Sequence, residues 1–202
     1  MYEATGDPEH LAAVQGAAHR LTRLAVSVLD DETGLDWPRC EGETPTGATW
    51  CTGATGIGRF FLHAAQVDAV FGAAEVATRA ARTAAHGARW LGPTQCHGLA
   101  GNIEFLIDMY QATRERSYLT EARTLAHLLE AFSVEREGVL MYVSDPPTTV
   151  TPHYMVGYAG VASCLRRLAD PGRAGPDLTS PRSVRPRTSA PAPWSEGRTP
   201  RW

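Results

Sequence analysis

Residues 50–58 of this 202-residue chain read WCTGATGIG, and the same frame of two glycines separated by two residues returns twice further along. The second copy, CHGLAGN, spans residues 96–102, and the third, MVGYAGV, spans residues 155–161. Cysteine stands two places before the leading glycine in the first two copies, and a histidine follows that cysteine in the second. Methionine and valine take these places in the third copy. The sequence therefore repeats a tight turn three times and equips it with thiol or imidazole side chains twice.

Between these turns, hydrophobic residues recur with the period of an α-helix. The predicted helices cover residues 7–29, 56–72, 73–90, 103–110, 118–132 and 158–168. Those that directly follow a glycine turn are mostly apolar, whereas residues 73–90 and 118–132 each combine one apolar stripe with charged residues. This pattern predicts inner, buried helices alternating with outer ones that have a wet face. The polar stretch 34–47 is predicted to be a loop, and residues 139–143 a small strand or hairpin.

The leading glycines Gly53, Gly98 and Gly157 lie 45 and 59 residues apart, a spacing typical of stacked helical hairpins. We therefore predict an all-α fold, a partial α/α toroid with an incomplete ring, over residues 1–172. In such a ring the inner helices direct their N-terminal turns at one central mouth. The six turn glycines (Gly53, Gly56, Gly98, Gly101, Gly157 and Gly160) either allow positive φ or let neighbouring helix N-termini crowd together.

Bulk composition excludes several classes of function. An apolar fraction of 43% is ordinary for a globular domain, and a formal net charge of −3 provides no basic surface for nucleic acid. The sequence has neither the run of ~18 apolar residues that a spanning helix needs nor a signal peptide, so we expect no membrane span and a cytoplasmic location. Residues 173–202, rich in proline, serine and arginine, are predicted to form a disordered tail.

Cys51, Cys96 and His97 would all face the predicted mouth. Without a signal for export we interpret the cysteines as free thiols, and two thiolates with one imidazole are a ligand set that zinc favours. The alternative is that both cysteines are small buried residues and that His97 caps a helix; spacing alone does not decide, because no C-x-x-C pair is present. His153, two residues before the third turn, could also reach the mouth. A sugar-cleaving enzyme would need a carboxylate pair there, and only Glu104 lies beside a turn.

The motifs around these residues resemble those of the lanthionine synthetase C-like (LanC) cyclases, whose signatures are W-C-x-G-x-x-G-I and C-H-G-x-x-G-N. The resemblance covers residues 34–172. It implies an α/α toroid, a Zn²⁺ ion on Cys51, Cys96 and His97, and addition of a peptide cysteine thiolate to dehydroalanine or dehydrobutyrine. The product would be a thioether ring in a lanthipeptide. The implied partners are a dehydrated precursor peptide and an N-terminal kinase/lyase or a dehydratase.

Three features differ from the family pattern. Gly47 and Thr52 stand where family members usually carry an arginine and a tyrosine or histidine. The family's acid–base histidine lies in earlier repeats, and a chain of this length supplies only roughly three helical hairpins. We therefore expect the C-terminal part of such a cyclase, either active or a catalytically silent remnant that keeps zinc and peptide binding.

Overall fold

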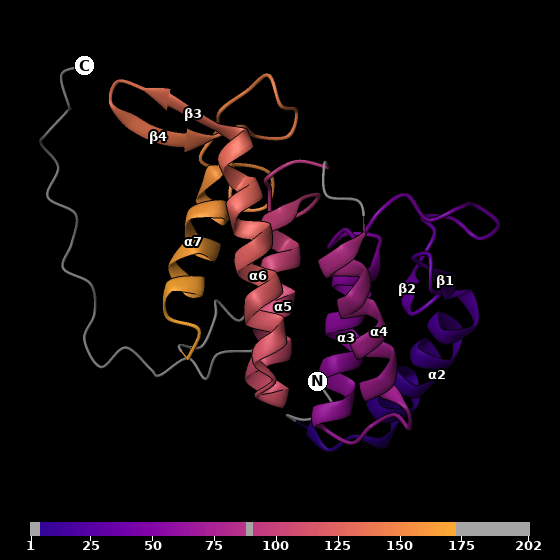
Figure 1. The fold of residues 1–202 in the computed structure, drawn as a ribbon. Helices are drawn as coiled ribbons and strands as arrows, with labels where there is room; N and C mark the ends of the chain where they lie inside the picture. Colours follow the sequence, from indigo (N-terminus) through magenta and orange to yellow (C-terminus); the bar gives the residue numbers. More distant parts are fainter. Residues whose placement is uncertain (1–4, 88–90, 173–202) are drawn as a thin grey trace, which may run out of the picture.

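The computed structural model describes residues 5–87 and 91–172, and this part of the chain is mostly helical (Figure 1). Its α-helices are α2 (Pro8–Leu24), α3 (Ala54–Gln66), α4 (Ala73–His86), α5 (Leu99–Thr113), α6 (Arg116–Leu128) and α7 (Tyr158–Ala169), with a short 3-10 helix, η1 (Leu129–Phe132), after α6. Two antiparallel hairpins complete it: β1 (Val26–Val28) with β2 (Gly34–Asp36), and β3 (Ser133–Arg136) with β4 (Val139–Tyr142). The predicted helical fold is confirmed, with two small hairpins added.

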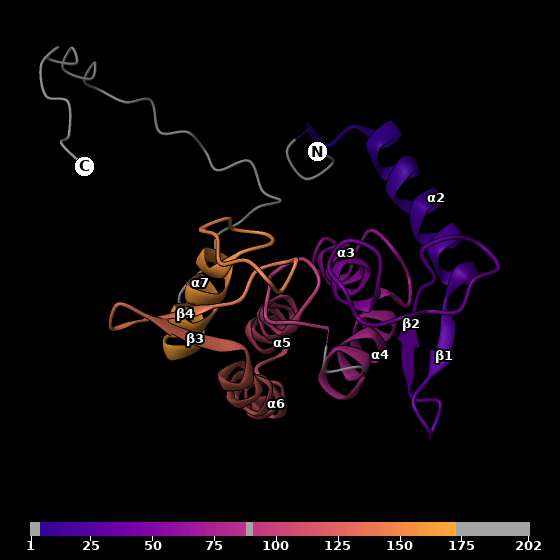
Figure 2. The same cartoon turned by 90° about the horizontal axis from the view of Figure 1, so that it is seen from above.

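The helices form the two layers of a partial toroid. Viewed from above, α3, α5 and α7 follow one another, and α4 and α6 lie outside them (Figure 2). Helix α5 contacts both α3 and α7, while α4 packs on α3 and α6 packs on α5. All residues from Leu99 to Ile107 on α5 are buried, whereas α6 buries only Leu119, Ala122 and Leu125. The predicted order of inner and outer helices is therefore observed.

The turn glycines are required by close backbone contact. None of the six has a positive φ; the three leading ones, for example, have φ between −122° and −145°. A Cβ on Gly56, Gly101 or Gly160 would lie only 1.9, 2.2 or 2.0 Å from the carbonyl oxygen six residues earlier. A Cβ on Gly53, Gly98 or Gly157 would likewise lie 2.4, 2.1 or 2.3 Å from the carbonyl oxygen six residues earlier. The expectation of positive φ is wrong. The closest contacts are within each turn's own loop, and a Cβ on Gly160 would also lie 3.0 Å from Gln95 Cβ, just before the second turn, in line with the expected crowding between neighbours.

This contact predicts a large difference between two glycine-to-alanine changes. Gly56→Ala should lower the free energy of unfolding by about 1–3 kcal/mol or more, because the new methyl group overlaps the Trp50 carbonyl. Gly16→Ala, inside α2 with open space at its Cβ, should instead raise it by roughly 0.5–1 kcal/mol. Urea unfolding of both variants measures the difference. Equal stability of the two variants would contradict the repeated turn geometry.

Several predicted boundaries are wrong, and the largest error concerns the segment before the first turn. The first helix ends at Leu24, and the following residues form the β1–β2 hairpin, so part of the predicted loop 34–47 is a strand. Helix α4 holds this hairpin in place: Arg79 donates a hydrogen bond to the Glu32 carbonyl (2.8 Å) and Thr83 to the Leu35 carbonyl (2.7 Å). Asp36, at the end of β2, accepts a 2.8 Å bond from the Ala54 amide and so satisfies the first amide of α3.

The other differences are smaller. The second predicted helix ends at Gln66 instead of residue 72, and the fourth extends over Leu99–Thr113. The predicted strand at 139–143 is β4, and its partner β3 follows η1 directly. The third predicted helix ends at His86; residues 88–90 and the predicted tail 173–202 lie outside the described residues. No helix in the described part is long and apolar enough to cross a bilayer.

A buried charge network joins the three inner helices. Arg167 on α7 is 6% exposed and donates hydrogen bonds to Glu104, which is 2% exposed, and to Asp108 (2.5 Å), both on α5. Arg59 on α3 pairs with the second oxygen of Asp108 at 2.8 Å. Burial raises the pKa of Glu104 and Arg167 opposes that shift; burial would lower the pKa of Arg167, but Asp108 and Glu104 raise it. Glu104 therefore belongs to the helix packing, not to a carboxylate pair at a mouth.

Candidate metal centre

Backbone hydrogen bonds bring the three glycine turns side by side. The Trp50 amide of the first turn donates to the Cys96 carbonyl of the second (3.0 Å), and the Cys96 amide donates to the Met155 carbonyl of the third (2.8 Å). A buried side-chain bond from the Thr55 hydroxyl to Asn102 Oδ1 (2.6 Å) links the first turns of α3 and α5. The main chain thus fixes the distance between Cys51 and the Cys96–His97 pair.

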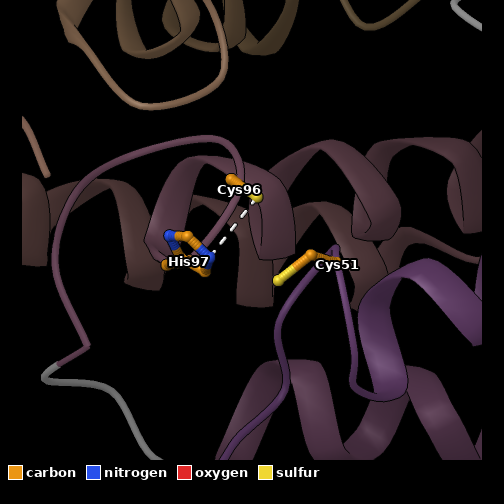
Figure 3. A group of neighbouring side chains, drawn as sticks. All are labelled: Cys51, Cys96 and His97. Atoms are coloured by element: carbon orange, nitrogen blue, oxygen red, sulfur yellow. Dashed lines mark hydrogen bonds between the residues drawn. The ribbon is translucent and has the colours of Figure 1, made fainter. Parts of the chain in front are cut away.

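The ligand atoms of Cys51, Cys96 and His97 all lie within 4.8 Å of one another (Figure 3). Cys96 Sγ and His97 Nε2 are 3.6 Å apart. A tetrahedral ion with metal–sulfur bonds of ~2.3 Å and metal–nitrogen bonds of ~2.0–2.1 Å separates such atoms by ~3.5–3.6 Å. Cys51 is exposed, and Cys96 and His97 are partly exposed. Cys96 Sγ and His97 Nε2 thus have the spacing of two ligands of one tetrahedral ion, and the exposure of Cys51 leaves the group open to solvent.

His97 is held from its far side by an aspartate. Its Nδ1 lies 2.5 Å from Asp145 Oδ2, while its Nε2 faces Cys96 Sγ. Asp145 follows the β3–β4 hairpin, and its own amide donates to the Val156 carbonyl (2.8 Å) in the third turn. The ring nitrogens therefore have different surroundings: one faces a carboxylate and the other faces a thiol.

Without a cation, the site opposes ionisation of Cys96. Burial, hydrogen bonding with Cys51 and the charges of Cys51 and Asp145 raise the pKa of the Cys96 thiol to about 11. Cys51 Sγ lies 3.8 Å from the Thr49 hydroxyl and 3.9 Å from the Thr52 hydroxyl. A divalent cation would reverse this balance by stabilising the thiolates.

The structure brings some of the predicted site residues together and leaves others apart. It brings Cys51, Cys96 and His97 together, and their exposure contradicts the alternative of two small core residues. His97 does not cap α5, whose N-cap is Gly98. His153 is exposed and is not part of the three-residue group found among the described residues. Cys164 is fully buried on α7, and the cysteines are free thiols as predicted.

Two site features were not found from the sequence. Gly47, with φ 151°, and Gly92, with φ 122°, occupy the same place six residues before a leading glycine, so position 47 here carries a turn conformation that favours glycine over arginine. Asp145 begins an Asp-Pro-Pro sequence, which is typical of a chain break after a strand and does not indicate a metal site. It lies 48 residues from His97 in the sequence, and no local sequence pattern predicts that the two side chains pair.

Comparison with protein families supports the resemblance noted in the motifs. A family model described as "Lanthionine synthetase C-like protein" matches residues 1–178. The match includes every described residue and begins upstream of residue 34, where the motif resemblance starts.

Proposed function

The chain belongs to the lanthionine synthetase C-like family, and we propose that it is a zinc-dependent member that forms thioether rings in dehydrated peptides. The observation that carries this proposal is the gathering of two thiols and one imidazole within 4.8 Å at the ends of two inner helices. The proposed substrate contains a cysteine and a dehydroalanine or dehydrobutyrine. A separate dehydratase or kinase/lyase would have to make the dehydrated residue from serine or threonine.

Zinc is proposed because of the donor chemistry. Thiolate and imidazole ligands suit zinc, whereas calcium and magnesium prefer oxygen. Two thiolates would balance the two charges of the ion, and an open fourth position would admit a peptide thiol. The exposure of Cys51 leaves room for such a thiol to approach.

The proposed reaction conserves all atoms. When bound, the zinc ion would lower the pKa of the peptide thiol and so supply a thiolate nucleophile. Cys51, Cys96 and His97 would hold the ion where the group is open to solvent. A bound peptide could there present both its cysteine and its dehydrated residue. The peptide sulfur forms a bond to the β-carbon, the double-bond electrons move toward the neighbouring carbonyl as an enolate, and the α-carbon takes up one proton. The thiol hydrogen is replaced by the α-carbon hydrogen, so the mass of the peptide is unchanged.

A second candidate is a silent protein that binds zinc and peptide without turnover. It is favoured by the residues around the metal group of Cys51, Cys96 and His97. Within residues 5–87 and 91–172, His97 is the only histidine in this group. The hydroxyls of Thr49 and Thr52 lie beside Cys51. A ligand histidine cannot also donate the proton that the enolate needs.

The two candidates are separated by supplying a dehydrated, cysteine-containing peptide and following free thiol and peptide mass together. Thiol loss at constant mass that is retained in Cys40→Ser and absent in Cys96→Ala supports the cyclase. Cys40 is a suitable control because it is an exposed free cysteine outside the metal group. Binding of zinc and peptide without thiol loss supports the silent protein, and absence of zinc binding contradicts both.

Zinc affinity should increase with pH. Because the pKa of Cys96 is about 11 in the metal-free site, protons compete with the ion throughout the neutral range. Each thiol must lose its proton on binding, so the logarithm of the apparent association constant should rise by up to about two per pH unit. Competition with a chromophoric chelator at several pH values measures the slope. A slope of zero would show that the two thiols are not ligands.

A further inference from the structure

The contact between His97 and Asp145 joins a proposed ligand to a carboxylate of a different repeat. The distance of 2.5 Å between His97 Nδ1 and Asp145 Oδ2 is short enough for a strong hydrogen bond, with the imidazole N–H as donor. A proton on Nδ1 leaves the lone pair of a neutral ring on Nε2, which is the nitrogen that faces Cys96 Sγ at 3.6 Å. The carboxylate thus selects the imidazole tautomer in which Nε2 carries the lone pair and faces the cysteines.

Asp145 is itself held in place by main-chain and buried contacts. Its amide donates to the Val156 carbonyl at 2.8 Å. The neighbouring Ser144 is buried; its amide donates to the Thr149 carbonyl and its hydroxyl accepts from the Thr151 amide, both at 2.8 Å. The carboxylate is therefore attached to a loop that its own hydrogen bonds hold in shape and that the Asp145 amide ties to the third glycine turn.

The third turn has no thiol or imidazole, yet it supports both ligands of the second turn. The Met155 carbonyl accepts the amide of Cys96, and the adjacent Val156 carbonyl accepts the amide of Asp145, whose carboxylate contacts His97. Two successive carbonyls thus fix the positions of a sulfur ligand and of the partner of a nitrogen ligand.

We infer that Asp145 is a positioning residue of the metal centre: it holds His97 in the Nδ1–H form and orients Nε2 as the ligand. This inference rests on the proposed metal function. The side chains of His97 and Asp145 are 41% and 42% exposed, and an ion pair so exposed contributes little to folding stability. The effect of Asp145 is instead on the tautomer and the orientation of the His97 imidazole. Removing the partner of a ligand histidine typically weakens metal affinity by about 10–100-fold.

The test compares Asp145→Ala and Asp145→Asn with Glu135→Gln, a carboxyl-to-amide change at an exposed position of the β3–β4 hairpin. The zinc dissociation constant should rise about 10–100-fold in Asp145→Ala, rise less in Asp145→Asn, whose amide oxygen still accepts a hydrogen bond, and stay unchanged in Glu135→Gln. Thermal unfolding should show that all three variants remain folded.

A second measurement reports on the ring itself. Long-range ¹H–¹⁵N correlation spectra of the metal-free protein at mildly alkaline pH should show His97 as the Nδ1–H form in wild type and Glu135→Gln, and a mixture of both ring forms in Asp145→Ala. Unchanged ring form and zinc affinity in Asp145→Ala would overturn the role of Asp145 while leaving the metal site intact. Wild-type protein that takes up no zinc, as judged beside Cys96→Ala, would overturn the proposed function as well.

Discussion

Cys96→Ala is expected to abolish stoichiometric zinc binding, with the dissociation constant rising by more than the roughly 100-fold that loss of an outer partner causes. The substitution removes one of two sulfur donors and leaves Cys51 and His97, one fewer than the three protein ligands of a zinc site with an open position. Elemental analysis of purified protein and competition with a chromophoric chelator measure the loss.

The cysteines outside the group provide controls for this result. Cys40→Ser should bind zinc as wild type does, because Cys40 is exposed and outside the group. Cys51→Ala should behave as Cys96→Ala does. Zinc content that is unchanged in both Cys51→Ala and Cys96→Ala would show that the metal is bound elsewhere.

Arg167→Met should lower the free energy of unfolding by about 3–5 kcal/mol, since breaking a buried ion pair leaves the partner charge uncompensated. The partner left uncompensated is Glu104, which is only 2% exposed, because Asp108 still pairs with Arg59 at 2.8 Å. Urea unfolding monitored by far-ultraviolet circular dichroism measures the change.

The neighbouring arginine is a matched control for this substitution. Arg166 lies on the same helix and is exposed, so Arg166→Met should change the free energy of unfolding by less than about 0.5 kcal/mol. Adding Glu104→Gln to Arg167→Met should recover part of the loss, because it removes the unpaired charge. Equal stability of Arg166→Met and Arg167→Met would contradict the buried network.

The helical layers could be predicted because each is encoded by a local pattern. Apolar residues between 103 and 110 predict a buried helix, and the stripe that includes Leu119, Ala122 and Leu125 predicts an outer one. The β1–β2 hairpin could not be predicted in this way, since Val28 also fits the stripe of the preceding helix. Its position depends on Arg79 and Thr83 of α4, more than forty residues later in the chain.

In the candidate site, too, local sequence patterns predict some residues and not others. Cys51, Cys96 and His97 stand in short motifs and could be selected from the sequence, whereas Asp145 is brought to His97 by the packing of a loop against the third turn. The role of the turn glycines was also ambiguous, because the sequence cannot distinguish a positive φ from close contact with a carbonyl. The contact of Gly56 with the Trp50 carbonyl resolves that question in favour of close contact.

X-ray absorption spectroscopy of the zinc-loaded chain tests the proposed metal centre, because it reports the atoms bound to the ion. We expect two sulfur neighbours at ~2.3 Å and two nitrogen or oxygen neighbours at ~2.0–2.1 Å, from Cys51, Cys96, His97 and one exchangeable ligand. A first shell of nitrogen and oxygen alone, or one with a single sulfur, would contradict it.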